Sequence, residues 1–100
     1  MVRLFYYDRN SEKFLSNLDL NRIPNPILEM TRITLLDISN NNLNSLPKEI
    51  SNLKELRVLD CSKNHLNTIP ISLGKLKNLE TLILKDNPIY DHPEISKKSA

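Results

Sequence analysis

The sequence predicts an α/β solenoid in which short parallel strands alternate with short helical turns. The first observation is a phrase of the form Leu-Asn-x-(Ile/Leu)-Pro, which ends at Pro24, Pro47 and Pro70 and therefore returns every 23 residues. The second is that apolar residues between these prolines recur at the same period, and the third is that Pro93 keeps the count. A fixed period between about 20 and 50 residues indicates a repeat architecture, in which each repeat forms one coil of a stack.

The composition is that of one small domain with an aliphatic core. The chain has 100 residues, which allow at most one ordinary domain. Apolar residues make up 39% of the sequence, aromatic residues only 5%, and there is no Trp, so Leu and Ile must fill the core. The 14 basic and 12 acidic residues leave a net charge of +2 without a dense basic stripe. The sequence therefore does not predict nucleic acid as a partner.

Several features favour an intracellular protein. Cys61 is the only cysteine, which excludes an internal disulfide. The sequence holds no apolar run of about 18 residues and begins without the apolar stretch of a secretory signal, so we expect no membrane insertion. It also has no Asn-x-Ser/Thr acceptor for glycosylation. We therefore expect a cytoplasmic location.

Three copies of the pattern L-x-x-L-x-L-x-x-N-x-L predict the strands. They begin at Ile33, Leu56 and Leu79. Within each copy the apolar residues alternate, which is typical of a short half-buried strand whose aliphatic side chains point into the coil. The Asn of each copy should end the strand at a tight bend, because its amide can both donate to and accept from buried backbone groups. We expect the stacked amides to form a ladder of Asn41, Asn64 and Asn87.

The segment after each proline predicts a short helical turn. Ile50 and Leu53 stand three residues apart in one repeat, and Leu73 and Leu76 do so in the next. This spacing places both side chains of a pair on one face of a helical turn. Only one or two turns fit, so packing against the neighbouring repeats must hold them.

These repeats resemble the leucine-rich repeat family over about residues 10 to 95. The 23-residue length and the Leu/Ile-Pro-x-x-Ile/Leu corner are most similar to the intracellular Ras-group type. The resemblance implies short parallel strands on a concave face and short helical or 3-10 turns on the convex face. It also implies a protein partner, such as a small GTPase, a phosphatase or kinase subunit, or a scaffold protein. We expect no cofactor.

The pattern weakens at both ends of the chain. Leu18 replaces the ladder Asn in the first unit, so we interpret residues 1–14 as a degenerate first repeat or an amino-terminal cap. The solenoid then spans residues 15–95 with about 3.5 repeats of 23 residues, and a polar tail occupies residues 96–100. No clear cap closes the last repeat. Self-association through open ends is therefore a further expectation, and the pattern is equally consistent with a fragment of a longer protein.

The sequence contains no convincing catalytic or metal-binding group, so we do not expect an enzyme. Asp60, Ser62 and His65 come nearest to a nucleophile group, but His65 falls beyond the Asn bend and no oxyanion-stabilising arrangement accompanies it. Cys61 takes an inward strand position, so it points away from His65, and two ligands are too few for a zinc site. A single glycine, Gly74, excludes a glycine-rich phosphate loop.

The outward strand positions are the candidate binding residues. In a repeat solenoid the variable outward side chains form an extended surface that contacts a partner. Asp37 and Asp60 are equivalent in neighbouring repeats, and two alternatives stay open: they bind a basic side chain of a partner, or they only hydrogen-bond along the sheet. Phe14 joins this surface if the first unit forms a strand. The predicted partner-binding residues are Leu35, Asp37, Ser39, Asn40, Val58, Asp60, Ser62, Lys63, Thr81, Ile83, Lys85 and Asp86.

The sequence therefore predicts a non-catalytic protein–protein interaction module that binds a protein partner on its concave strand face, with a role in signalling. The alternative is a regulatory or targeting repeat segment of a larger enzyme, such as a cyclase, a deadenylase or a GTPase-kinase. A catalytic domain beyond either end of the chain would favour that alternative. An extracellular recognition repeat is a third class, but the flanking cysteines that would support it are absent from the sequence.

Overall fold

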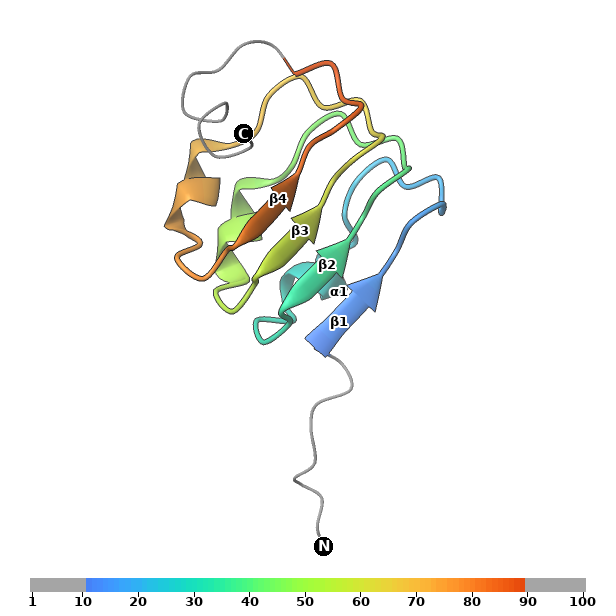
Figure 1. The fold of residues 1–100 in the computed structure, drawn as a ribbon. Coiled ribbons are helices and arrows are strands. Elements are labelled where there is room, and N and C mark those ends of the chain that lie inside the picture. The colour runs from blue at the N-terminus through green and yellow to red at the C-terminus, as the bar shows by residue number, and fades with distance from the viewer. Residues whose placement is uncertain (1–10, 90–100) are drawn as a thin grey trace, which may run out of the picture.

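The computed structural model describes residues 11–89 and shows a coil of alternating strands and helical turns (Figure 1). The predictions for residues 1–10, for Pro93 and for the tail at 96–100 lie outside the described residues. In chain order the elements are β1 (Glu12–Phe14), α1 (Asn25–Leu28), β2 (Leu35–Asp37), η2 (Lys48–Asn52), β3 (Val58–Asp60), η3 (Ile71–Lys75) and β4 (Thr81–Ile83).

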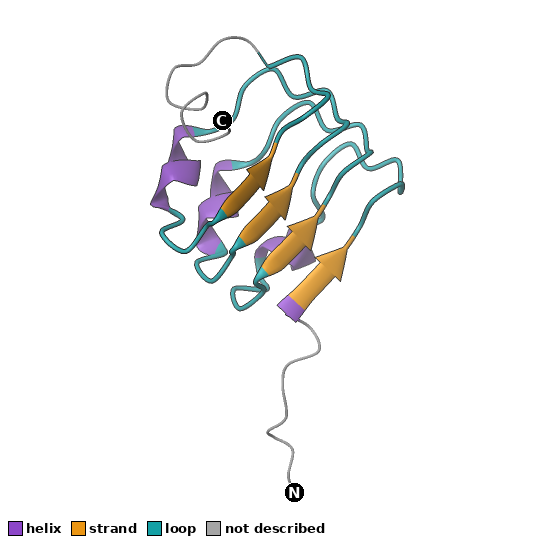
Figure 2. Ribbon diagram, in the orientation of Figure 1, coloured by secondary structure: helices purple, strands orange, loops and turns teal. Residues whose placement is uncertain are grey.

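The strands form one parallel sheet in the order β1-β2-β3-β4. The register advances by one repeat at each strand, so that Leu36 pairs with Leu59 and Leu59 with Leu82. Parallel neighbours need a crossover connection, and here the helical turns supply it on one side of the sheet (Figures 1 and 2). The predicted fold class, a solenoid with short parallel strands on one face and short helical or 3-10 turns on the other, is confirmed.

Each helical turn begins directly after a repeat proline. Pro24, Pro47 and Pro70 precede the turns with φ values of −59°, −72° and −71°, which are the angles that the proline ring imposes. The turns that follow are only 4 or 5 residues long, too short to be stable alone. They are held instead by packing and by bonds between repeats, as when the Ser72 hydroxyl donates to the carbonyl of Lys48 at 3.1 Å.

The core fills the space between the sheet and the helical turns. The two middle repeats are the most deeply buried, and Leu36, Leu59 and Leu66 have no exposed surface. Leu82 and Leu84 occupy equivalent inward positions in the last described strand but are only partly buried. The core is almost entirely aliphatic, as the low aromatic content of the sequence predicts. The side chains that are almost or fully enclosed are Ile33, Leu36, Ile38, Leu43, Ile50, Leu53, Leu56, Leu59, Cys61 and Leu66.

The sheet continues across the boundary that the sequence pattern places between residues 14 and 15. Strand β1 pairs with β2 through Glu12, Lys13 and Phe14. The chain then continues in the same coil, because the Leu15 amide donates to the carbonyl of Asp37 at 2.7 Å. Lys13 takes the register position that Leu36 takes in the next strand. Because Lys13 is polar, the alternation of apolar residues that predicts a strand is missing from this segment.

Candidate functional site

The outward side of the sheet, here called the strand face, carries the predicted binding residues in rows that cross the strands in register. Its first row is Leu35, Val58 and Thr81, and its second row is Asp37, Asp60 and Ile83. Strand β1 extends both rows, since Glu12 pairs with Leu35 and Phe14 pairs with Asp37. Phe14 is 64% exposed, so an aromatic ring stands at the end of the second row.

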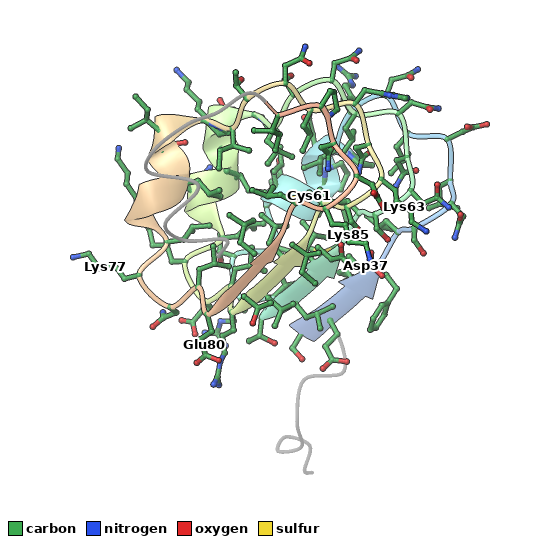
Figure 3. The ribbon with its side chains drawn as sticks, turned by 45° about the horizontal axis from the view of Figure 1, so that its top comes forward. Asp37, Cys61, Lys63, Lys77, Glu80 and Lys85 are labelled. Carbon is green, nitrogen blue, oxygen red and sulfur yellow. The ribbon has the colours of Figure 1, made fainter. Side chains whose placement is uncertain are left out.

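Two further rows lie beyond the carboxyl ends of the strands. Ser39, Ser62 and Lys85 form the third row and are half-buried or exposed. The fourth is Asn40, Lys63 and Asp86, whose φ values of 54°, 56° and 61° are all left-handed. Figure 3 shows Asp37, Lys63 and Lys85 near the carboxyl ends of the strands, whereas Glu80 lies near their amino ends. The predicted binding residues therefore share one face and its adjoining edge.

Each aspartate of the second row is fixed by a serine two residues later. Asp37 Oδ1 accepts hydrogen bonds from the amide of Ser39 at 3.0 Å and from its hydroxyl at 2.7 Å. Asp60 Oδ1 accepts the same two bonds from Ser62 at the same distances. The hydrogen bonds thus run along each strand and not from one aspartate to the next. Within residues 11–89 neither carboxylate has an ion-pair partner, because the described ion pair joins Arg57 and Glu80 at 2.8 Å.

Cys61 lies directly behind this acidic pair and has no exposed surface. Burial raises the pKa of its thiol far above the ordinary value of 9.0, and the negative charges of Asp60 and then Asp37 raise it further. The side chain therefore stays a neutral thiol and serves as a core residue, since nucleophilic attack and metal binding both need the thiolate.

Asn64 shows how each amide of the ladder connects its own repeat to the preceding one. Its Oδ1 accepts from the amide of Leu43 at 3.0 Å in the preceding repeat. Its Nδ2 lies within hydrogen-bond distance of three carbonyls, those of Ile38 at 3.0 Å, Cys61 at 3.0 Å and Ser62 at 3.1 Å. Asn64 is 4% exposed, so these backbone groups have little access to water.

Asn41 and Asn87 make equivalent contacts in the repeats on either side. Asn41 Oδ1 accepts from the amides of Leu18 and Leu20, both at 3.0 Å. Asn87 Oδ1 accepts from Leu66 at 2.9 Å, and its Nδ2 donates to the carbonyl of Cys61 at 2.9 Å. Every bond reaches back to an earlier repeat or closes the residue's own bend. The ladder therefore stiffens the edge next to the third and fourth rows.

The first coil contributes residues that the sequence pattern did not single out. Asn17 and Asp19 have φ values of 60° and 58°, so the left-handed bend recurs in this coil although Leu18 replaces the ladder Asn. The side chain of Asn40 donates to Asn17 Oδ1, and that of Asn42 donates to Asp19 Oδ1 at 3.0 Å. Asn and Asp tolerate left-handed angles better than other side chains, and this preference was an available signal.

The remaining surfaces offer little for catalysis or metal binding. The hydroxyl of Ser62 donates to Asp60, and His65 lies exposed beyond the bend, so these three residues do not form a nucleophile group. Among residues 11–89 no group of three His, Cys, Asp or Glu side chains is placed to hold a metal ion. No helix in this part of the chain is long and apolar enough to cross a membrane.

Two shallow hollows lie away from the strand face. One of about 480 Å³ separates α1 from η2 and is lined by polar groups that include Arg22, Glu29 and Glu49. The other, of about 380 Å³, lies at the start of β3 and β4 around the Arg57–Glu80 ion pair. Both are open and mixed in charge. Neither gathers the acid, base and nucleophile that an active site needs.

Comparisons with known proteins agree with this geometry. Residues 31–89 match a family model described as leucine rich repeat. The fold is similar to that of a leucine-rich repeat protein of Leptospira interrogans, with a TM-score of 0.76 and 41% sequence identity over 86% of this chain. The match spans only 21% of the Leptospira chain. No curated protein sequence is significantly similar to this one. The family match and the solenoid of register-paired strands place the chain in the leucine-rich repeat family.

Proposed function

We propose that this chain is a non-catalytic protein-interaction module and that its strand face binds the partner. Domains of the leucine-rich repeat family are generally protein-binding modules. The observation that carries the proposal is a parallel sheet with one face that none of the described elements covers. Parallel sheets are normally covered on both faces, yet no described element packs on the strand face here. That face exposes Phe14 and leaves Leu35, Val58 and Ile83 only half-buried.

The chemistry of the face favours a protein over other ligands. Apolar side chains stand beside the acidic pair, and Lys63 and Lys85 follow at the strand ends. A mixture of apolar, acidic and basic groups is typical of protein interfaces, whereas nucleic acid would require a basic stripe. The two hollows described above, the kind of feature that could enclose a small molecule, lie away from this face.

A more specific role follows from the repeat type. The 23-residue length and the proline corner support assignment to the Ras-group subtype, and with it a role in cytoplasmic signalling. The partner would then be a small GTPase, a phosphatase or kinase subunit, or a scaffold protein. A fluorescent fusion in the source cell tests the location: a diffuse cytoplasmic signal supports this role, and secretion or surface display contradicts it.

A second candidate is a regulatory or targeting segment within a larger protein. The observation that favours it is length, because the Leptospira chain is matched over only 21% of its residues. In that case the same strand face would bring the larger protein to its target. Mass spectrometry of the intact protein from the source cell distinguishes the two candidates.

The test of the proposed function compares two arginine substitutions on opposite faces. Val58→Arg changes the centre of the strand face, whereas Ile71→Arg changes a side chain of η3 that is 86% exposed on the helical side. Wild type and both variants, matched in melting temperature, are immobilised and exposed to lysate. We expect Val58→Arg alone to lose the proteins that wild type captures. Equal capture by Val58→Arg, or loss in Ile71→Arg alone, overturns the proposal.

A further inference from the structure

The second row of the strand face has a chemical order that specifies a partner segment. It runs Phe14, Asp37, Asp60, Ile83 across four neighbouring strands, with an apolar residue at each end and the two carboxylates in the middle. We propose that the strand face binds an extended protein segment of the form apolar–x–Arg–x–apolar, which crosses the strands along this row. The proposal rests on the proposed function and names the chemistry of its partner.

The spacing of the row fits such a segment. Neighbouring strands lie about 4.8 Å apart, so the midpoint between the Asp37 and Asp60 strands is about 7 Å from the strands of Phe14 and Ile83. In an extended chain, side chains two residues apart point the same way and are separated by about 6.6 to 6.8 Å. A central side chain can therefore lie between the aspartates while its neighbours at −2 and +2 reach the apolar ends.

The acidic pair is prepared for one cation. Both Oδ1 atoms are held by serine hydrogen bonds, which fix the two carboxylates in the same orientation on adjacent strands. Within residues 11–89 no hydrogen bond reaches the Oδ2 atom of either aspartate. The strands that carry the two carboxylates lie about 4.8 Å apart, so the two negative charges repel each other, and a cation bound between them offsets that repulsion.

Arginine matches the pair better than lysine or a metal ion does. The planar guanidinium has five N–H donors in a rigid fork and can bridge two carboxylates, whereas lysine offers a single point charge. Its stem could lie on the half-buried Leu35 and Val58 of the first row. Calcium takes six to eight oxygen ligands. The described residues provide no acidic group beyond this pair at the site.

The apolar ends fix the position of the segment along the row. Phe14 is 64% exposed, and an apolar side chain of the partner would cover its ring. Ile83 is half-buried in β4, the strand at the other end of the row. Because the row has the order apolar–acid–acid–apolar, it accepts the segment in either chain direction. Moving the arginine by one residue would turn it away from the sheet.

The direct test is an NMR titration of the ¹⁵N-labelled chain with a synthetic peptide, acetyl-Gly-Leu-Ser-Arg-Ser-Phe-Gly-amide. We expect shifts confined to the strands and their carboxyl ends. Replacing arginine by citrulline, which keeps the shape and removes the charge, should weaken binding by about tenfold or more. Moving arginine by one residue should do the same. Shifts elsewhere, no shifts, or equal binding of the citrulline peptide overturn the proposal.

Protein variants supply the matched control. Asp37→Asn with Asp60→Asn removes two charges but keeps the Oδ1 acceptors of the serine hydrogen bonds, so the fold should persist. Glu49→Gln with Glu55→Gln removes two charges from exposed positions outside the rows. We expect about tenfold weaker peptide binding only in the aspartate variant. Equal weakening in both variants would reduce the effect to net charge and overturn the proposal.

This proposal and the proposed function can fail separately. If a cellular partner is lost from Val58→Arg but binds the double Asp→Asn variant as well as wild type, the strand face is the binding site and the arginine proposal fails. If Val58→Arg retains the partner, the proposed function fails, whatever the peptide titration shows.

Discussion

Replacing Asn64 by alanine tests whether the amide ladder holds the coils together. Asn64 is 4% exposed and bonds to four backbone groups. Three of them keep another donor when the side chain is removed. The carbonyl of Ile38 retains the Nδ2 of Asn41, that of Cys61 retains Asn87, and that of Ser62 retains the amide of Asn40.

Most of the free-energy cost of the substitution therefore comes from one buried donor, the backbone amide of Leu43. The amide of Leu43 bonds to Asn64 Oδ1, and no other acceptor is recorded for it within residues 11–89. An unsatisfied buried group costs about 1 to 3 kcal/mol, and losing the shared bonds to the carbonyls adds a fraction of that. We predict that Asn64→Ala lowers the free energy of unfolding by about 2 to 3 kcal/mol. In a domain of this size that corresponds to a drop of roughly 10 °C or more in melting temperature.

Differential scanning calorimetry measures this change, and Asn67→Ala is the matched control. Asn67 is exposed, lies three residues further along the same bend, and makes no recorded hydrogen bond within the described part of the chain. Its substitution should change stability by less than about 0.5 kcal/mol. If the two variants melt within about 2 °C of each other, the ladder does not carry the stability assigned to it here.

Two further predictions concern the same edge of the sheet. Because the folded state keeps the Cys61 thiol protonated, its contribution to stability is complete below the unfolded pKa of 9.0 and falls as pH rises above it. Wild type should lose about 1.4 kcal/mol more than Cys61→Ala by about pH 10 in urea unfolding, and parallel pH profiles would refute this. Lys63 has a left-handed φ of 56°, which a branched side chain adopts only with backbone strain. Lys63→Val should therefore destabilise the fold by about 1 to 2 kcal/mol, whereas Lys63→Asn should be neutral or stabilising. Calorimetry in which both variants match wild type would contradict the inference of backbone strain at this residue.

The period of the sequence was enough to predict the solenoid because each repeat residue has one physical role. Leu36, Leu59 and Leu82 are inward in every strand, and the prolines precede every helical turn. The type of turn was less predictable: α1 forms a single α-helical turn, whereas η2 and η3 are 3-10 helices. Such short turns differ by small backbone adjustments that apolar spacing does not encode.

The first coil escaped the pattern for a physical reason. Lys13 stands where the other strands have leucine, and Leu18 stands where the other bends have asparagine. Backbone pairing with β2 forms the strand in spite of both substitutions. The consequence for the site is Phe14, which entered the sequence prediction only conditionally and proves to be an exposed aromatic residue of the strand face.

The outward residues could be assigned from alternation, but their hydrogen bonds could not. The sequence left open whether Asp37 and Asp60 bind a basic side chain of a partner or only hydrogen-bond along the sheet. The structure shows that each bonds to the serine two residues later. That choice depends on side-chain rotamers at the strand ends, which the apolar period does not determine. The repeat period does not predict the partner either. Inward positions must be apolar because they pack in the core, whereas outward positions have no such constraint and vary from repeat to repeat.

Site-specific photo-cross-linking in the source cell tests most directly whether the strand face binds a protein. The photoreactive residue p-benzoylphenylalanine is placed at Thr81, exposed on the strand face, or at Lys75, exposed at the end of η3 on the helical side. The account predicts a discrete cross-linked protein from Thr81 and none from Lys75. Cross-linking from Lys75 alone, or equally from both positions, would contradict it.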